Sequence, residues 1–173
     1  MDEKIKPIKI VLLDVDGVLT DGTIVLGKNE ELKFFNAHDG MAISYVRKVG
    51  IKVGIITGRT SEAVKKRAEE LHMDFLYQDC KRKLDTLNKI LHNEGMEYQH
   101  VCFIGDDIID IPLLKNVGFA ATVDDAPDIV KSHADYVSPR PGGRGAVRDV
   151  LDYILKTQGT YDTAINALLE EWI

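Results

Sequence analysis

Short apolar runs along the chain alternate with longer stretches in which apolar residues recur every three to four positions. The first run, residues 8–13, is rich in β-branched residues and suits a strand covered on both faces. The periodic stretches between such runs are typical of amphipathic helices. We predict strands near residues 8–13, 51–56, 74–77, 101–104, 119–123 and 135–137, and helices near residues 41–48, 61–71, 83–93, 110–115, 127–132 and 146–155. This order predicts an α/β fold with a doubly wound, mainly parallel, Rossmann-like sheet that carries helices on both faces.

One segment interrupts the alternation. Residues 23–26 and 32–35 are mostly apolar and flank a turn-forming loop at 27–31, which predicts a β-hairpin inserted after the first strand, over about residues 22–36. Asp39 is then expected to cap the first helix, and Gly50 to end it.

The C-terminal part of the chain, about residues 138–173, begins with a loop rich in proline and glycine. The last helix follows this loop. Residues 159–173 then carry several apolar side chains, and the sequence leaves open whether they dock on their own subunit or on a neighbour.

Length and composition fit one domain covering residues 1–173. The chain can bury one good core, and its hydrophobic content of 45% with 29% charged residues is ordinary for a globular protein. No apolar run is long enough to span a bilayer, and the first residues lack the pattern of a secretory signal, so we expect a cytoplasmic protein and no membrane partner. A net charge of −6 argues against nucleic acid as a partner. Cys80 and Cys102 form neither a disulfide framework nor a zinc motif.

The most informative residues, Asp14 and Asp16, stand at the end of the first predicted strand. The carboxyl edge of a parallel sheet is where open α/β sheets bind ligands. Two carboxylates on one strand face need a cation or a proton, and Gly17 allows the chain to turn away sharply. Taken alone, the motif is equally compatible with an ordinary Asp/Gly turn, so the later strand ends must decide.

The second strand ends with Thr57, Gly58 and Arg59, which offer a hydroxyl, a closely approachable backbone and a guanidinium suited to an oxyanion. Lys83 stands in the first turn of a later helix. Alone it is most simply a solvated surface residue, although it could also hold a phosphate group.

The fourth strand is followed by Asp106, Asp107 and Asp110. Alone these acids could simply favour a helix N-terminus. Opposite Asp14 and Asp16, however, they predict a Mg²⁺ site, because Mg²⁺ prefers hard oxygen ligands and bridges to substrate phosphate.

In this order the motifs resemble those of the haloacid dehalogenase superfamily phosphatases. Further stretches resemble one group of these enzymes, the 3-deoxy-D-manno-octulosonate 8-phosphate (KDO 8-phosphate) phosphatases, from about residue 9 to residue 158. The stretches are residues 14–22, 32–36 with Asp39 and Gly40, 56–59, 76–78 and 142–148.

The resemblance implies a Mg²⁺-dependent phosphomonoesterase of lipopolysaccharide sugar biosynthesis. Asp14 would be the nucleophile and Asp16 the general acid/base. The Mg²⁺ ligands would be Asp14, the backbone carbonyl of Asp16 and Asp106, supported by Asp107 and Asp110. An aspartyl phosphate would be the intermediate.

The resemblance also implies the remaining site residues and the assembly. Family members lack a cap domain and form homotetramers in which the hairpin partly closes the active site of the next subunit. Thr57 and Lys83 would bind the phosphoryl group, and the sugar phosphate would be bound by Asn36, His38, Asp39, Gly40, Gly58, Arg59, Arg67 and Arg144.

Several positions depart from the family pattern. Asp79 and Cys80 stand where glycine usually follows the Leu-Tyr-Gln stretch, and His38 and Ser44 replace residues that are more often basic. Arg59 favours the eight-carbon substrate, since related enzymes for nine-carbon sialic-type acids resemble Glu at this position.

Three alternatives stay open. The substrate could be a nine-carbon keto acid 9-phosphate. A phospho-accepting receiver domain of two-component signalling shares much of the geometry, but it lacks a proton shuttle such as Asp16 and carries its acidic pair early in the chain. The domain could also be retained for binding or assembly alone.

Overall fold

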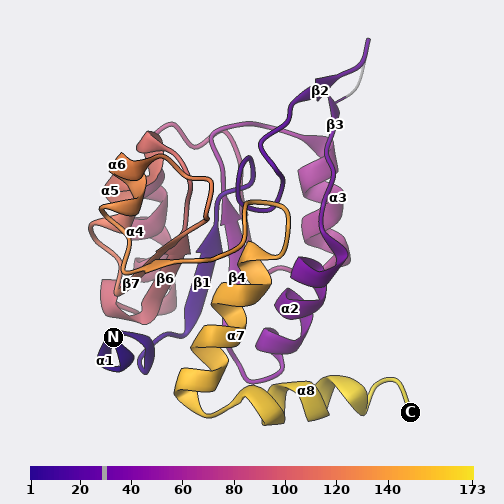
Figure 1. Ribbon diagram of the computed structural model, residues 1–173, viewed down its shortest axis with the longest axis vertical. Coiled ribbons are helices and arrows are strands. Elements are labelled where there is room, and N and C mark those ends of the chain that lie inside the picture. The colour runs from indigo at the N-terminus through magenta and orange to yellow at the C-terminus, as the bar shows by residue number, and fades with distance from the viewer. Residues whose placement is uncertain (29–30) are drawn as a thin grey trace.

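The computed structural model describes residues 1–28 and 31–173 and is built on one parallel sheet (Figure 1). The strand order is β5-β4-β1-β6-β7-β8, so the first strand lies in the middle and the chain winds outward in both directions. This order confirms the predicted doubly wound sheet. The strands are β1 (Ile10–Leu13), β4 (Lys52–Ile56), β5 (Phe75–Tyr77), β6 (Val101–Ile104), β7 (Phe119–Thr122) and β8 (Tyr136–Val137).

Helices cover both faces of the sheet (Figure 1). Along β1, Val11 and Leu13 join the core on one face, whereas Ile10 and Leu12 join the core on the other. All four side chains are fully buried, as expected for a central parallel strand. The first core includes residues of α1 (Asp2–Ile5), α2 (Ala37–Arg47), α3 (Glu62–Glu70), α7 (Ala146–Gln158) and α8 (Tyr161–Leu169), and the second those of α4 (Lys83–Glu94), α5 (Ile111–Leu114) and α6 (Asp128–Lys131).

The inserted hairpin is present, with shorter strands than predicted. β2 (Val25–Leu26) pairs antiparallel with β3 (Glu31–Leu32), and the hairpin projects away from the body of the molecule (Figure 1). Of the predicted turn, residues 29 and 30 lie outside the described residues. The described part of the chain contains no cap domain, so the hairpin is the main addition near the carboxyl edge of the sheet.

The first long helix begins earlier than predicted, and Asp39 is not its cap. α2 starts at Ala37, and the side chain of Asn36 accepts hydrogen bonds from the backbone N–H groups of His38 and Asp39. Asn is as good a cap as Asp, and it stands where the extended chain enters the helix. Asp39 lies inside the first turn and is free to bond elsewhere.

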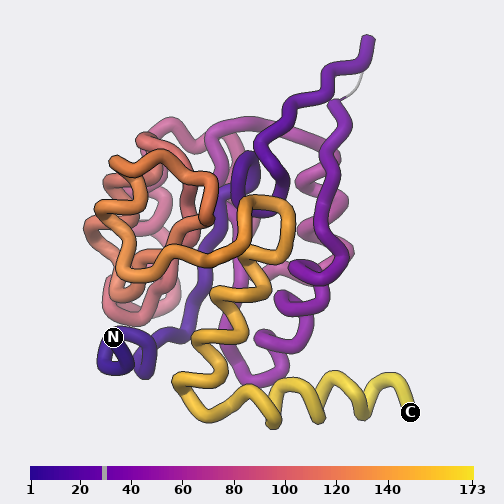
Figure 2. The backbone as a smooth tube through the Cα atoms, viewed as in Figure 1, coloured from indigo at the N-terminus to yellow at the C-terminus, as the bar shows by residue number. Residues whose placement is uncertain are grey.

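In the C-terminal segment, α8 packs on its own chain, which is one of the two arrangements that the sequence allows. α8 lies against α2 and α7 and crosses the end of the domain away from the hairpin (Figure 2). Ala164 is fully buried, and the Tyr161 ring meets the Tyr45 ring edge to face. Within the described residues, no helix combines the length and apolar character that a membrane crossing requires.

Candidate active site

The polar groups predicted to act together lie at the carboxyl ends of neighbouring strands. Asp14 directly follows β1, Thr57 follows β4, and Asp106 comes two residues after β6. Because β1 pairs with β4 on one side and β6 on the other, these three ends meet at one edge of the sheet. Asp14 and Thr57 are both buried there. The sheet order therefore brings these three residues to one edge.

Lys83 is the central cation of this site and not a solvated surface residue. It is only 4% exposed, and its Nζ lies 3.0 Å from Asp14 Oδ2 and 2.6 Å from Asp110 Oδ1. Burial by itself would lower the pKa of Lys83, but the attraction of the two carboxylates outweighs it and raises that pKa. Lys83 therefore stays charged.

The site holds more negative charge than Lys83 can balance. Oxygens of Asp14, Asp106 and Asp110 lie within 4.8 Å of one another, a spacing that one metal ion can bridge. Asp14 Oδ1 and Asp106 Oδ1 are buried without a hydrogen-bond partner. Burial, followed by the neighbouring carboxylates, raises the pKa of Asp106 to about 8, and burial and then Asp110 raise the pKa of Asp14 to about 6. Unpartnered carboxylate oxygens of this kind fit a hard divalent cation.

The two supporting acids behave differently. Asp110 is fully buried, and its second oxygen accepts hydrogen bonds from the backbone N–H groups of Asp106 and Asp107. It therefore shapes the turn that carries Asp106. Asp107 is exposed, and its carboxylate accepts the N–H of Ile108 at the start of the 3₁₀ turn η2 (Ile108–Asp110). Asp107 thus lies outside the cluster of metal-spaced carboxylates, and its supporting role at the metal stays a prediction.

Gly17 and the glycine-rich loop bring the catalytic turn close to Asp106. Gly17 has a φ of +87°, and a Cβ at this position would lie 1.9 Å from Asp106 Oδ2. On the opposite side, a Cβ on Gly142 would lie 1.8 Å from the Gly17 carbonyl oxygen, and the Gly143 N–H donates to the Val18 carbonyl. The loop thus packs backbone to backbone against the turn after β1.

The Asp16 carboxylate lies between two cations, Lys33 and Arg59. Lys33 and its second partner, Glu31, were not among the predicted site residues. Asp16 Oδ1 lies 2.5 Å from Lys33 Nζ, and Asp16 Oδ2 lies 3.6 Å from Arg59 Nε. Glu31 contacts both cations. Lys33 and Glu31 come from the hairpin. A lysine among alternating strand residues is typical of an ordinary exposed position, so only the fold could reveal this contact.

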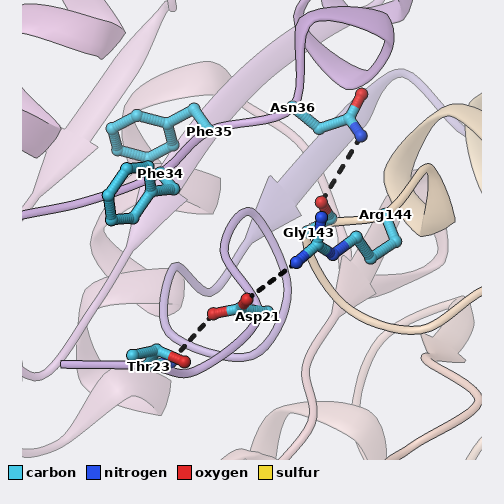
Figure 3. A pocket seen from close by; sticks show the side chains of 7 residues that line it. All are labelled: Asp21, Thr23, Phe34, Phe35, Asn36, Gly143 and Arg144. Carbon is cyan, nitrogen blue, oxygen red and sulfur yellow. Dashed lines mark hydrogen bonds and ion pairs between the residues drawn. The ribbon is translucent and has the colours of Figure 1, made fainter.

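Asn36 and Arg144 line a pocket of about 340 Å³ between the hairpin and the glycine-rich loop (Figure 3). The Asn36 side chain donates to the Gly143 carbonyl at 3.4 Å, and Arg144 pairs with Asp21 at 3.2 Å. The aromatic side chains of Phe34 and Phe35 line the same pocket. None of the residues that line this pocket belongs to the cluster of Asp14, Asp106 and Asp110.

Asp39, a predicted substrate ligand, is hydrogen-bonded to the backbone of its own chain. It is 1% exposed, and its carboxylate accepts the N–H groups of Gly145, at 3.3 Å, and Arg148, at 2.8 Å. Asp39 therefore caps α7 from a distant part of the chain and fixes the glycine-rich loop. Burial raises the pKa of Asp39, although the two hydrogen bonds act in the opposite direction.

Gly40 and Arg67 also fit a structural interpretation. A Cβ on Gly40 would lie 2.2 Å from Arg67 Nη2, so glycine makes room for the guanidinium. Arg67 donates to the Asn36 carbonyl and lies over the Phe35 ring. It thereby supports the segment that leads from the hairpin into α2. Gly40 is buried, and its role in substrate binding stays a prediction.

The positions that depart from the family pattern have visible consequences. Asp79 has a φ of +54°, a left-handed conformation that glycine adopts without strain and Asp tolerates better than most residues. Gly58 approaches this segment, since a Cβ on Gly58 would lie 3.8 Å from the Cys80 carbonyl oxygen. His38 is exposed and lines a pocket of about 300 Å³ with residues at the start of α7. Ser44 donates to the Gly40 carbonyl.

Comparisons with known proteins agree with the fold and the motifs. Residues 75–151 match a family model described as haloacid dehalogenase-like hydrolase. The 3-deoxy-D-manno-octulosonate 8-phosphate phosphatase KdsC of Escherichia coli K12 is 43% identical over 162 residues, which cover 93% of this chain and 86% of the relative.

Solved structures of similar proteins extend this likeness to the whole fold. The phosphatase of the same name from Yersinia pestis has a TM-score of 0.91 at 39% identity, covering 93% of this chain and 88% of the other. The enzyme from Moraxella catarrhalis, solved with a magnesium ion, a phosphate ion and a KDO molecule, has a TM-score of 0.93 at 36% identity, covering 96% and 97%.

Proposed function

Because the chain belongs to the family of 3-deoxy-D-manno-octulosonate 8-phosphate phosphatases, which are haloacid dehalogenase-like hydrolases, we propose that it hydrolyses this sugar phosphate in lipopolysaccharide sugar biosynthesis. The products are the free sugar acid and phosphate. The observation that carries the proposal is the buried arrangement of Asp14, Lys83 and Asp110, with Asp106 beside them at the carboxyl edge of the sheet. A cytoplasmic location stays a prediction.

We propose Mg²⁺ as the cofactor. The Asp14 and Asp106 carboxylates would hold it together with the backbone carbonyl of Asp16, and their unpartnered oxygens support this assignment. When bound, Mg²⁺ neutralises charge on the phosphoryl group and on the carboxylates around it. Asp110 is placed to hold the turn that carries Asp106.

In the first step of the proposed reaction, a carboxylate oxygen of Asp14 attacks phosphorus and the bond from phosphorus to the ester oxygen of the sugar breaks. Asp16 gives its proton to the departing alkoxide. Lys83 already contacts Asp14, so its ammonium can orient the nucleophile and attract the phosphoryl oxygens. The Thr57 hydroxyl and the backbone of Gly58 complete the phosphate site.

In the second step, a water molecule attacks phosphorus of the aspartyl phosphate. Asp16, now ionised, takes a proton from this water, and the bond between phosphorus and Asp14 breaks. Phosphate leaves and both carboxylates return to their starting states. One carboxylate thus serves as acid and then as base, as the reaction requires.

For substrate recognition, we propose that Arg59 binds the sugar carboxylate, since its guanidinium lies next to Asp16 and is partly exposed. The other predicted substrate-binding side chains lie around the base of the hairpin: Asn36, His38, Arg67 and Arg144. We propose that they serve the active site of a neighbouring subunit within a homotetramer.

The exposed hairpin supports this assembly. Leu26 is 72% exposed and Phe34 is 70% exposed. Large apolar side chains that lie together on a surface are typical of a site that another protein surface covers. Ile24 and Leu32 on the same hairpin are about half exposed. In a homotetramer these side chains would be covered by a neighbour and would narrow the mouth of its capless site.

A phosphate-release screen tests the proposal. Purified protein is incubated with eight-carbon and nine-carbon keto acid phosphates, with and without Mg²⁺. We expect Mg²⁺-dependent release with the highest kcat/KM for the eight-carbon 8-phosphate. Preference for the nine-carbon 9-phosphate would reassign the substrate, and release from neither would contradict the proposed function.

A further inference from the structure

The hairpin contributes a buried cation to the active site of its own chain. Lys33 directly follows β3, and its side chain is only 1% exposed. Its Nζ lies 2.5 Å from Asp16 Oδ1 and 2.8 Å from Glu31 Oε1. A lysine without solvent contact needs such partners, since burial removes its hydration. The hairpin is therefore anchored at the residue proposed to move protons.

A second cation completes the contact. Arg59 places its Nε 3.6 Å from Asp16 Oδ2 and its Nη2 3.3 Å from Glu31 Oε1. Each Asp16 oxygen thus faces one cation, and Glu31 holds both cations in place. The two acids and the two cations thus alternate in charge. Because a cation contacts each of its two oxygens, the Asp16 carboxylate is restrained in one orientation.

The two contacts of Asp16 differ in strength. Lys33 is enclosed and makes short contacts, whereas the Arg59 side chain is 45% exposed and its contact is longer. Exposed ion pairs contribute little, but a desolvated pair with short distances constrains geometry strongly. Lys33 is therefore the main constraint on Asp16.

We propose that Lys33 is a positioning residue that holds the Asp16 carboxylate in the orientation required for proton transfer. The inserted hairpin then acts on the chemistry of its own subunit, in addition to any contact with a neighbour. This inference rests on the proposed function, in which Asp16 protonates the leaving group. In this role Lys33 acts through Asp16 and is not itself a catalytic residue.

The test compares Lys33→Met with Lys33→Arg and with the matched control Lys28→Met, which removes the same charge from an exposed position on the same hairpin. The measured quantity is kcat/KM for phenyl phosphate and p-nitrophenyl phosphate, because kcat/KM reports the steps up to departure of the leaving group. Nitrophenolate leaves without a proton, whereas phenolate depends more on the acid. Melting curves confirm that each variant is folded.

We expect Lys33→Met to lower kcat/KM for phenyl phosphate about ten- to hundredfold, a part of the usual general acid contribution, and for p-nitrophenyl phosphate less than about threefold. Lys33→Arg should restore most of the loss, and Lys28→Met should match the wild type. In an Asp16→Asn background, Lys33→Met should cause almost no further loss, since its target is already removed.

Equal losses on both substrates, or a full additional loss in the Asp16→Asn background, would show that Lys33 only stabilises the hairpin and would overturn the inference. Wild-type rates in a folded Lys33→Met variant would do the same. If Lys33→Met does not fold, Lys33→Gln serves instead, because its amide can still bond to Glu31. The aryl phosphates make this test independent of the sugar, so failure of the proposed substrate would be visible separately in the phosphate-release screen.

Discussion

Replacing Asp106 by Asn should stabilise the metal-free protein while removing its response to Mg²⁺. The Asp106 carboxylate is largely buried beside Asp14 and Asp110, has an oxygen without a partner, and has its pKa raised to about 8. Asn keeps the shape of the side chain and removes the charge. The variant therefore isolates the repulsion among the carboxylates.

The pH dependence of the free energy of unfolding follows from the protons that the folded and unfolded states bind. Between about pH 4 and pH 8, folded protein keeps a proton on Asp106 that the unfolded chain has lost, because burial and then Asp14 raise the pKa from its ordinary value of 3.8. The folded state binds more protons in this window, so the free energy of unfolding falls as pH rises. The cost of ionised Asp106 is complete above about pH 8.

The magnitude follows from the same shift. At about 1.4 kcal/mol for each pKa unit, the change from 3.8 to about 8 gives an upper bound of roughly 6 kcal/mol. Partial exposure and coupling to Asp14 reduce this to about 2 to 4 kcal/mol. For a chain of this length we expect a rise in Tm of about 5 to 10 °C for Asp106→Asn at pH 8, and a smaller rise at pH 5.

Melting curves in chelator, at pH 5 and pH 8, measure this difference. Asp124→Asn is the control, since Asp124 is an exposed acid after β7 and should leave Tm unchanged at both pH values. Adding Mg²⁺ should raise Tm of the wild type and not of Asp106→Asn. A metal-free Asp106→Asn variant that melts at or below the wild type at pH 8 would refute the reasoning.

Three further changes test other parts of the site. Asp14→Asn should lower kcat by several orders of magnitude without changing Tm by more than a few degrees, because the amide cannot attack phosphorus; a substantial residual rate in phosphate release would contradict its role. Phe34→Glu should dissociate the oligomer in sedimentation and lower kcat/KM for the sugar phosphate more than for p-nitrophenyl phosphate; a specific, active monomer would argue against shared sites. Gly142→Ala should cost about 1–3 kcal/mol and lower kcat, since its Cβ meets the Gly17 carbonyl, whereas Gly58→Ala has room and should leave Tm unchanged.

The sequence determined the fold class and the residues at the strand ends. Apolar runs of strand length specify buried strands, and βαβ connections almost always give a parallel sheet of one hand. The carboxyl ends of neighbouring strands then meet of necessity. The meeting of the strand ends that carry Asp14, Thr57 and Asp106 was therefore predictable from the sequence, and the strand pairing confirms it.

Contacts between segments far apart in the chain were decided only by the tertiary structure. Asp39 was predicted to cap its own helix, yet it caps α7 more than a hundred residues away, and Lys33 meets Asp16 across the hairpin. Local pattern carries no information about which surface a polar side chain will face after packing. These partners depend on the relative placement of whole elements, because the side chains bond only where burial has removed water and left few other donors or acceptors.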